Sequence, residues 1–128
     1  MDDIKTFEDI SLVVDVFYDR VRKDPLLGPV FMERITGSWE PHLQTMRNFW
    51  YTVLFAQAAY RGNPFMKHIN LPVQAMHFER WIQLFHQTID ELFTGSVADD
   101  AKQKAVKMGL LFQSKLNEIR NSRSKPVF

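Results

Sequence analysis

Asn63-Pro-Phe-Met-Lys-His-Ile-Asn-Leu-Pro72 is the stretch, residues 63–72, that decides whether this chain forms an ordinary four-helix bundle or another helical fold. Asn63 and Pro64 are a good N-cap and first-turn pair, so the sequence predicts a short helix over residues 64–69. Pro72 begins another segment, which leaves this helix little more than one turn. Such a segment is too short for a helix of an ordinary four-helix bundle, and segments that break a pattern in this way are often functional.

The rest of the chain has a helical pattern nearly throughout. Apolar residues recur at spacings of three and four, which predicts long helices over residues 7–23, 39–60, 73–93 and 98–121. A short apolar turn is expected over residues 26–34, because Asp24-Pro25 stops the first helix. The last helix should point these residues inward: Ala105, Met108, Leu111, Phe112, Leu116 and Ile119. The polar tail, residues 121–128, contains Pro126 and is expected to fray. The prediction is one all-α domain over residues 1–128.

The histidines are candidates for binding a metal. His68 stands on the short turn, and neutral imidazole is a common metal ligand that often holds a haem iron alone. The alternative for His68 is an exposed or core-edge histidine. His42 lies on the apolar face of the second long helix, where a partly buried histidine with a hydrogen-bond partner is the alternative. His77 is expected at a pocket rim, and His86 is expected to point outward.

Three hydrogen-bonding side chains from three different helices are expected to converge. Tyr18 lies beside Phe17 on the inward side of the first helix, and Trp81 lies on the inward side of the helix over residues 73–93. His42 would join them from the second long helix. A purely structural core would use Leu or Phe at such positions, because buried Tyr and Trp require hydrogen-bond partners.

Composition excludes several classes of protein. The chain has 128 residues, no cysteine and a net charge of +1. Disulfides, thiolate zinc sites, iron–sulfur clusters and covalent haem attachment are therefore excluded. The basic residues are scattered, so neither nucleic acid nor a membrane is expected as a partner. The acidic N-terminus has no apolar signal region and no run of residues approaches membrane-spanning length, so a cytoplasmic location is expected. Eleven phenylalanines suit a core, or the walls around a flat apolar ligand.

Several stretches, taken in order and spacing, resemble the truncated haemoglobins, and among them group III. The resemblance runs from about Phe7 to Leu116. The stretches are Phe17-Tyr-Asp-Arg-Val-Arg-Lys-Asp-Pro-Leu-Leu-Gly-Pro-Val-Phe31, Trp39-Glu-Pro-His-Leu43 with Asn48-Phe-Trp50, Tyr60-Arg-Gly-Asn-Pro64 with Lys67-His-Ile-Asn-Leu-Pro72, and His77-Phe-Glu-Arg-Trp-Ile-Gln-Leu-Phe85. The chain lacks the paired-glycine motifs of groups I and II, which fits group III.

The resemblance implies a two-over-two helical sandwich around non-covalently bound haem b (iron protoporphyrin IX). His68 matches the proximal iron ligand, and Tyr18, His42 and Trp81 match the distal pocket. Other expected haem contacts are Phe31, which would wedge against the ring, and Met46, Trp50, Lys67 and Phe78. Candidates for the haem propionates are Arg47, Arg61, Lys67 and Arg80, with Lys67 favoured because it adjoins His68; the alternative for each is a solvated surface charge.

The resemblance also implies a function. A haem iron held by one histidine would bind dioxygen, nitric oxide or carbon monoxide. Tyr18 and Trp81 would donate hydrogen bonds to bound oxygen, so slow oxygen release is expected, which argues against simple delivery. His42 could contact the ligand, gate its entry or bind the iron itself.

Two alternatives remain. One is a nitric oxide dioxygenase or peroxidase-like enzyme, which would need a separate reductase because the chain has no flavin or nucleotide motif. The other is a haem-free helical interaction module. For the haem protein, a monomer or weak dimer is expected.

Overall fold

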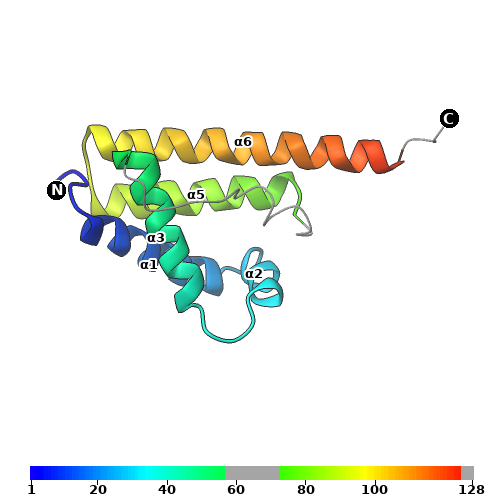
Figure 1. Ribbon diagram of the computed structural model, residues 1–128, viewed down its shortest axis with the longest axis horizontal. Coiled ribbons are helices and arrows are strands. Elements are labelled where there is room, and N and C mark those ends of the chain that lie inside the picture. Colours follow the sequence, from blue (N-terminus) through cyan, green and yellow to red (C-terminus); the bar gives the residue numbers. More distant parts are fainter. Residues whose placement is uncertain (57–72, 125–128) are drawn as a thin grey trace.

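The computed structural model describes residues 1–56 and 73–124, and these residues form helices and connections with no β-strand among them. The helices are α1 (Phe7–Lys23), α2 (Gly28–Arg34), α3 (Glu40–Phe55), α5 (Ala75–Leu92) and α6 (Ser96–Ser124). α5 and α6 lie side by side and antiparallel, and α1 packs on α5 and on α3 (Figure 1). The short helix α2 packs on α1. The predicted all-α fold is confirmed, whereas the short helix expected over residues 64–69 lies outside the described residues.

The bounds of α1 agree with the sequence prediction. Thr6 caps its first turn, accepting a hydrogen bond from the backbone N–H of Asp9 at 3.1 Å, while the Asp9 carboxylate accepts from the N–H of Thr6 at 3.2 Å. The apolar stripe of α1 is buried over its whole length: Ile10, Val13, Val14, Phe17, Tyr18 and Val21. Phe17 packs edge-on against Phe85 of α5, which joins α1 to the α5–α6 pair.

Asp24 ends α1 and begins α2. Its carboxylate accepts hydrogen bonds from the backbone N–H groups of Leu26 and Leu27, at 3.1 and 3.0 Å, and pairs with Arg80 of α5 at 2.7 Å. Gly28 lets α2 approach the end of α1 closely, because a Cβ there would lie 2.7 Å from the carbonyl oxygen of Arg22. The start of α2 is therefore fixed to both α1 and α5.

α3 is shorter than predicted. The sequence pattern extends to Tyr60, but the helix ends at Phe55 because Ala56 adopts a left-handed conformation (φ 54°). The Lys104 ammonium of α6 donates to the carbonyl oxygen of Val53 at 3.2 Å and so satisfies one of the acceptors at this end. A contact with a residue far along the chain thus helps to fix a boundary that the local pattern does not show.

α6 is longer than predicted, at both ends. It begins at Ser96, where the Asp3 carboxylate accepts from the backbone N–H groups of Val97 and Ala98 at 3.0 and 2.9 Å. It continues to Ser124, so the helix ends three residues later than the predicted bound at residue 121, and the fraying of residues 121–128 stays a prediction. The inward placement of Leu111 is also wrong. Its side chain is half exposed, because the buried face of the helix is centred on Ala105, Gly109 and Leu116.

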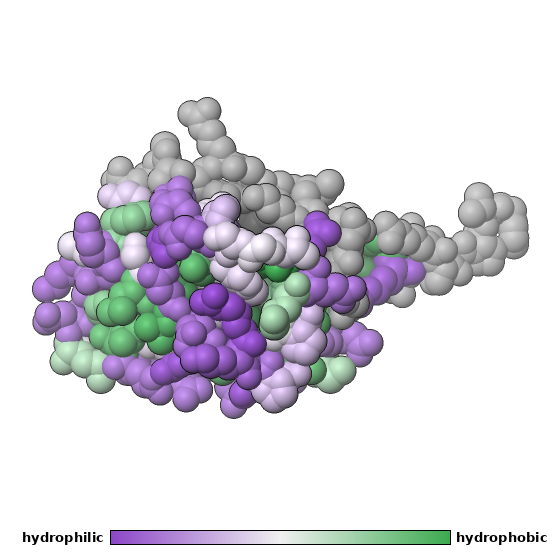
Figure 2. Space-filling model, turned by 90° about the horizontal axis from the view of Figure 1, so that it is seen from below, coloured by the Kyte–Doolittle hydropathy of each residue, from purple (hydrophilic) through white to green (hydrophobic). Residues whose placement is uncertain are grey.

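Hydrophilic and apolar side chains alternate on the face that Figure 2 shows. In Figure 2 the apolar residues of one face form separate patches between hydrophilic side chains. The large apolar side chains that are most exposed within the helices come from four of them: Leu12, Met32, Met76, Leu110 and Leu111. None of the helices in the described ranges is long and apolar enough to cross a membrane.

Candidate functional site

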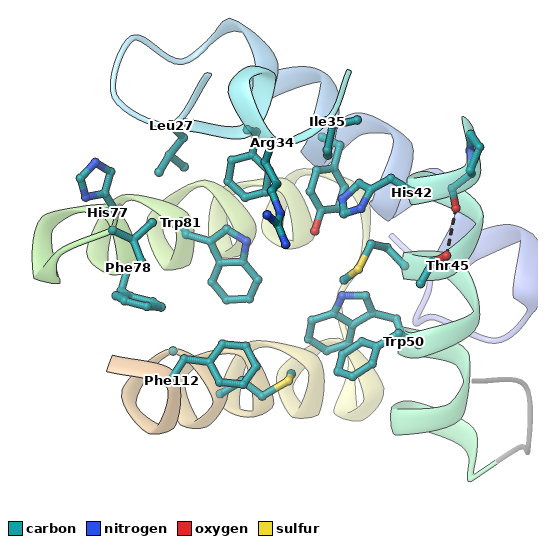
Figure 3. Close-up of a pocket in the computed structure, with 18 residues that line it drawn as sticks. Leu27, Arg34, Ile35, His42, Thr45, Trp50, His77, Phe78, Trp81 and Phe112 are labelled. Carbon is teal, nitrogen blue, oxygen red and sulfur yellow. Dashed lines mark hydrogen bonds between the residues drawn. The ribbon is translucent and has the colours of Figure 1, made fainter. Parts of the chain in front are cut away.

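The described helices enclose a cavity of about 400 Å³. This volume falls within the range of roughly 300–1,000 Å³ that pockets for small molecules and cofactors occupy. Each of the five described helices contributes to the lining, and Figure 3 shows the lining side chains around the space. Most of the lining is apolar or aromatic: Leu27, Phe31, Ile35, Met46, Phe49, Trp50, Val73, Phe78, Trp81, Met108 and Phe112.

The cavity brings together every predicted pocket residue that lies in the described ranges. These are Tyr18, Phe31, His42, Met46, Trp50, Phe78 and Trp81. His68 and Lys67 fall outside the described residues, so iron ligation by His68 stays a prediction. His77 lines the cavity, as expected of a residue at a pocket rim.

An aromatic stack holds the two tryptophans of the cavity wall. Trp50 of α3 stacks on Phe85 with ring centroids 4.8 Å apart and planes 17° from parallel. Trp81 stacks on the same ring at 5.8 Å and 9°. Since Phe85 is itself buried, its ring restricts the orientation of both indoles, and aromatic pairs of this kind stabilise by roughly 0.5–1.5 kcal/mol beyond their burial.

Tyr18 supplies a buried hydroxyl at the cavity. The residue is only 3% exposed, and this burial raises the pKa of the phenol above its ordinary value, an effect that a hydrogen bond with Trp81 reduces without reversing it. The phenol therefore stays protonated. An indole N–H can only donate, so the bond runs from Trp81 to the Tyr18 oxygen and leaves the Tyr18 proton to be donated elsewhere. Donation by Tyr18 and by Trp81 to a ligand in the cavity stays a prediction.

His42 lies between two aromatic rings. Its ring is edge-on to Tyr18 at 5.0 Å and edge-on to Trp39 at 5.8 Å, with interplanar angles of 88° in both cases. The guanidinium of Arg22 lies over the Trp39 ring, with its carbon 4.9 Å from the centroid. Arg22 therefore packs on Trp39, and Trp39 in turn packs on His42. Sequence reasoning missed this packing because the two residues come from different helices.

Two of the expected propionate ligands have other partners. The guanidinium of Arg47 pairs with Asp15 and with Glu40, both at 2.6 Å, and does not line the cavity. Arg80 pairs with the buried carboxylate of Asp24. Burial raises the pKa of that carboxyl, but the Leu27 N–H and the Arg80 guanidinium outweigh it and hold the pKa below its usual value. Neither residue lines the cavity, so the structure gives no support to either as a propionate ligand.

Two other histidine assignments can be compared with the structure. The Nδ1 atom of His77 accepts a hydrogen bond from the backbone N–H of Gln74 at 2.9 Å and so caps α5. The Nε2 atom of His86 lies 3.1 Å from the carbonyl oxygen of Lys102, so its N–H donates to α6. His86 was expected to point outward; instead it joins α5 to α6.

Arg34 was not foreseen as a residue of the site. It stands in the last turn of α2, and its guanidinium points into the cavity, toward the side from which Trp81 projects (Figure 3). Leu27, Phe31 and Arg34 recur at spacings of four and three, so one face of α2 forms this wall. The spacing was visible in the sequence, but an arginine at the end of a short helix is normally interpreted as a solvated surface charge.

The described residues fit a flat, largely apolar cofactor such as haem. Aromatic rings and methionines supply apolar walls, Tyr18 supplies a hydroxyl donor, and Arg34 supplies a positive charge. Five helices around such a cavity define a protein of the globin type.

Comparison with known proteins specifies the family. Residues 2–111 match the model of the family described as "Bacterial-like globin". The chain is 33% identical over 113 residues to the group 3 truncated hemoglobin ctb of Campylobacter jejuni, covering 85% of this chain and 89% of that protein. The crystal structure of a group III truncated hemoglobin from Campylobacter jejuni superposes with a TM-score of 0.84 and 31% identity, covering 91% of this chain and 95% of that one. The chain therefore belongs to the bacterial-like globins, as a truncated haemoglobin similar to those of group III.

Proposed function

We propose that this protein binds haem b non-covalently in the cavity and, through it, dioxygen and other diatomic ligands, with slow release of oxygen. When bound, haem supplies an iron with an open coordination position. The proposal assigns ligation of that iron to His68, contacts with the ring to Phe31, Met46, Trp50 and Phe78, and the ligand-facing polar wall to Tyr18, His42 and Trp81. Family membership and the apolar cavity support the cofactor.

The buried hydroxyl of Tyr18 is the observation that best supports slow release of oxygen. Burial keeps this hydroxyl protonated even though the Trp81 N–H donates to its oxygen, so its proton is available to an acceptor in the cavity. A ligand that bears partial negative charge, such as oxygen, gains more from this donor than carbon monoxide does. Hydrogen bonds to charged acceptors contribute roughly 1.5–3 kcal/mol, which corresponds to about 10- to 100-fold in affinity.

Absorption spectra test the cofactor. The purified protein reconstituted with hemin should show a Soret band in its oxidised, reduced and oxygenated forms, and His68→Ala should alter the spectrum of the reduced form. A protein that gives no Soret band with hemin would be the haem-free interaction module instead. The spectrum of the reduced form also distinguishes one axial histidine from two, which tests whether His42 binds the iron.

Oxygen dissociation tests the role of Tyr18. Tyr18→Phe should release oxygen about 10-fold faster or more, whereas carbon monoxide release should change much less. Tyr51→Phe is the matched control. It removes the same hydroxyl from a ring that packs on Phe7 and does not line the cavity. Equal oxygen dissociation rates in wild type and Tyr18→Phe would refute the role of this donor.

A further inference from the structure

Arg34 is the one side chain with a permanent charge in the lining that the structure describes. The other polar side chains of this lining are neutral or are histidines. Figure 3 shows the Arg34 guanidinium directed into the space instead of away from the molecule. Arg34 is an exposed residue, so its guanidinium keeps water while it borders the apolar walls, and a carboxylate that enters the cavity can replace that water.

The other arginines whose side chains the structure describes have partners. Arg20 pairs with Glu91, Arg47 with Asp15 and Glu40, and Arg80 with Asp24; Arg120 donates to the carbonyl oxygen of Val73, and Arg22 stacks on Trp39. Within residues 1–56 and 73–120, no ion pair or hydrogen bond engages Arg34. Its guanidinium therefore remains available to a group that enters the cavity.

The entering group must combine a flat apolar body with an anionic edge. The aromatic and aliphatic lining recognises the first property, and Arg34 recognises the second. The described lining contains no Asp or Glu that could neutralise the guanidinium internally. Haem has both properties, because its macrocycle is flat and apolar and its two propionates are carboxylates. A guanidinium binds a carboxylate through two parallel N–H···O bonds, a geometry that few other side chains offer.

We propose that Arg34 binds a propionate carboxylate of the cofactor and thereby retains and orients it, an inference that rests on the proposed haem function. The neighbouring elements favour this assignment. Arg34 is positioned by α2, whose start is fixed by Asp24, Gly28 and Arg80. A free anion that shares the carboxylate chemistry is the competing occupant, and the test separates the two.

The experiment compares two porphyrins in the reconstituted protein. Hemin carries both propionates, whereas hemin dimethyl ester carries no such charge. The rate of cofactor loss to a large excess of a haem-scavenging protein is measured for wild type, Arg34→Met and Arg34→Lys. Arg34→Met should lose hemin about 3- to 10-fold faster than wild type, and Arg34→Lys should be intermediate. Wild type and Arg34→Met should lose the dimethyl ester at the same rate. Lys23→Met, which removes a positive charge from an exposed position outside the cavity, should behave as wild type.

Three results overturn the proposal, and each has a distinct signature. If Arg34→Met loses hemin and its dimethyl ester with the same acceleration, the arginine supports the fold and not a carboxylate. If hemin retention is unchanged but azide binds several-fold more weakly to oxidised Arg34→Met, the guanidinium binds a free anion instead. If wild type forms no Soret complex with either porphyrin, the haem function itself fails.

Discussion

At the scale of single residues, the hydrogen bond between Trp81 and Tyr18 changes what a substitution should do. We expect Trp81 to act through Tyr18, because its N–H interacts with the Tyr18 oxygen. Trp81→Phe preserves an aromatic ring on Phe85 but removes that N–H. Tyr18→Phe and Trp81→Phe should each accelerate oxygen release, but the double variant should release oxygen more slowly than the product of the two single effects predicts.

Stopped-flow oxygen dissociation from the four proteins of this cycle measures the coupling. Residues in one hydrogen-bond network typically show coupling energies of about 0.5–3 kcal/mol. Strictly multiplicative rates would mean that the two side chains act independently on the ligand.

Asp24 should make the free energy of unfolding depend on pH below about pH 4. Its folded pKa is held below the value of about 3.9 that an unfolded Asp has, so the folded state is favoured by the ionised carboxyl. This stabilisation is fully present above the unfolded pKa and is lost as the pH falls through the folded pKa.

Asp24→Asn, which breaks the Arg80 pair, should lower the free energy of unfolding by about 1–3 kcal/mol at pH 7. Urea unfolding from pH 7 to pH 3 should show this difference shrinking below about pH 4; a difference that is independent of pH would exclude the ion pair as its cause.

Some site residues could be predicted from the sequence and others could not, and the reason is the range of their interactions. Tyr18, His42 and Trp81 occupy inward positions of periodic helices, so local spacing placed them at the cavity. Arg47 and Arg80 have partners 32 and 56 residues away, Asp15 and Asp24, and local spacing contains no information on such pairs. Arg34 was missed for the same reason, since its lack of a partner is visible only once the ion pairs of the other arginines are known.

At the scale of helices, the N-terminal segment controls the start of α6. Asp3 caps a helix that begins 93 residues later, and the backbone N–H of Thr94 donates to the carbonyl oxygen of Asp2 at 3.0 Å. Gly95 makes the approach possible: its φ is +141°, and a Cβ there would lie 2.4 Å from the Asp3 Cγ. The sequence pattern therefore set the start of α6 too late, because the capping group is not adjacent in sequence.

Removing this cap should destabilise the fold. Asp3→Ala should lower the free energy of unfolding by about 1 kcal/mol, the usual effect of losing an N-cap, and Gly95→Ala should cost more because backbone strain and the clash with Asp3 add to it. Gly37→Ala is the matched control, since Gly37 also has a positive φ (80°) but a Cβ there would meet nothing within 4 Å. Chemical denaturation gives the three values; equal losses for Gly95→Ala and Gly37→Ala would show that the clash with Asp3 contributes nothing.

At the scale of the whole molecule, the sequence predicted the number and order of the long helices because each carries its own apolar stripe. The cavity between the helices could not be predicted in this way, because its lining comes from several helices and no single apolar stripe specifies it. The stack of Trp50, Phe85 and Trp81 brings side chains of α3 and α5 into contact, and only the assembled fold shows this. For that reason periodicity predicted only that Tyr18, His42 and Trp81 point inward, whereas the resemblance to a known family predicted that Phe31, Met46 and Trp50 join them at the cavity.

A ligand in the cavity should stabilise the molecule as a unit, because it would contact side chains from each of the described helices. A ligand that binds only the folded state adds about 2.7 kcal/mol at a free concentration 100 times its Kd, which for a domain of this size should raise the Tm on the order of 10 °C. Differential scanning calorimetry of the protein with and without hemin measures the shift. The same titration on His68→Ala should give a smaller shift, since the apolar walls remain but the proposed iron ligand is lost. If hemin raises the Tm of both proteins equally, the walls alone account for binding, and the assignment of His68 to the iron would have to be abandoned.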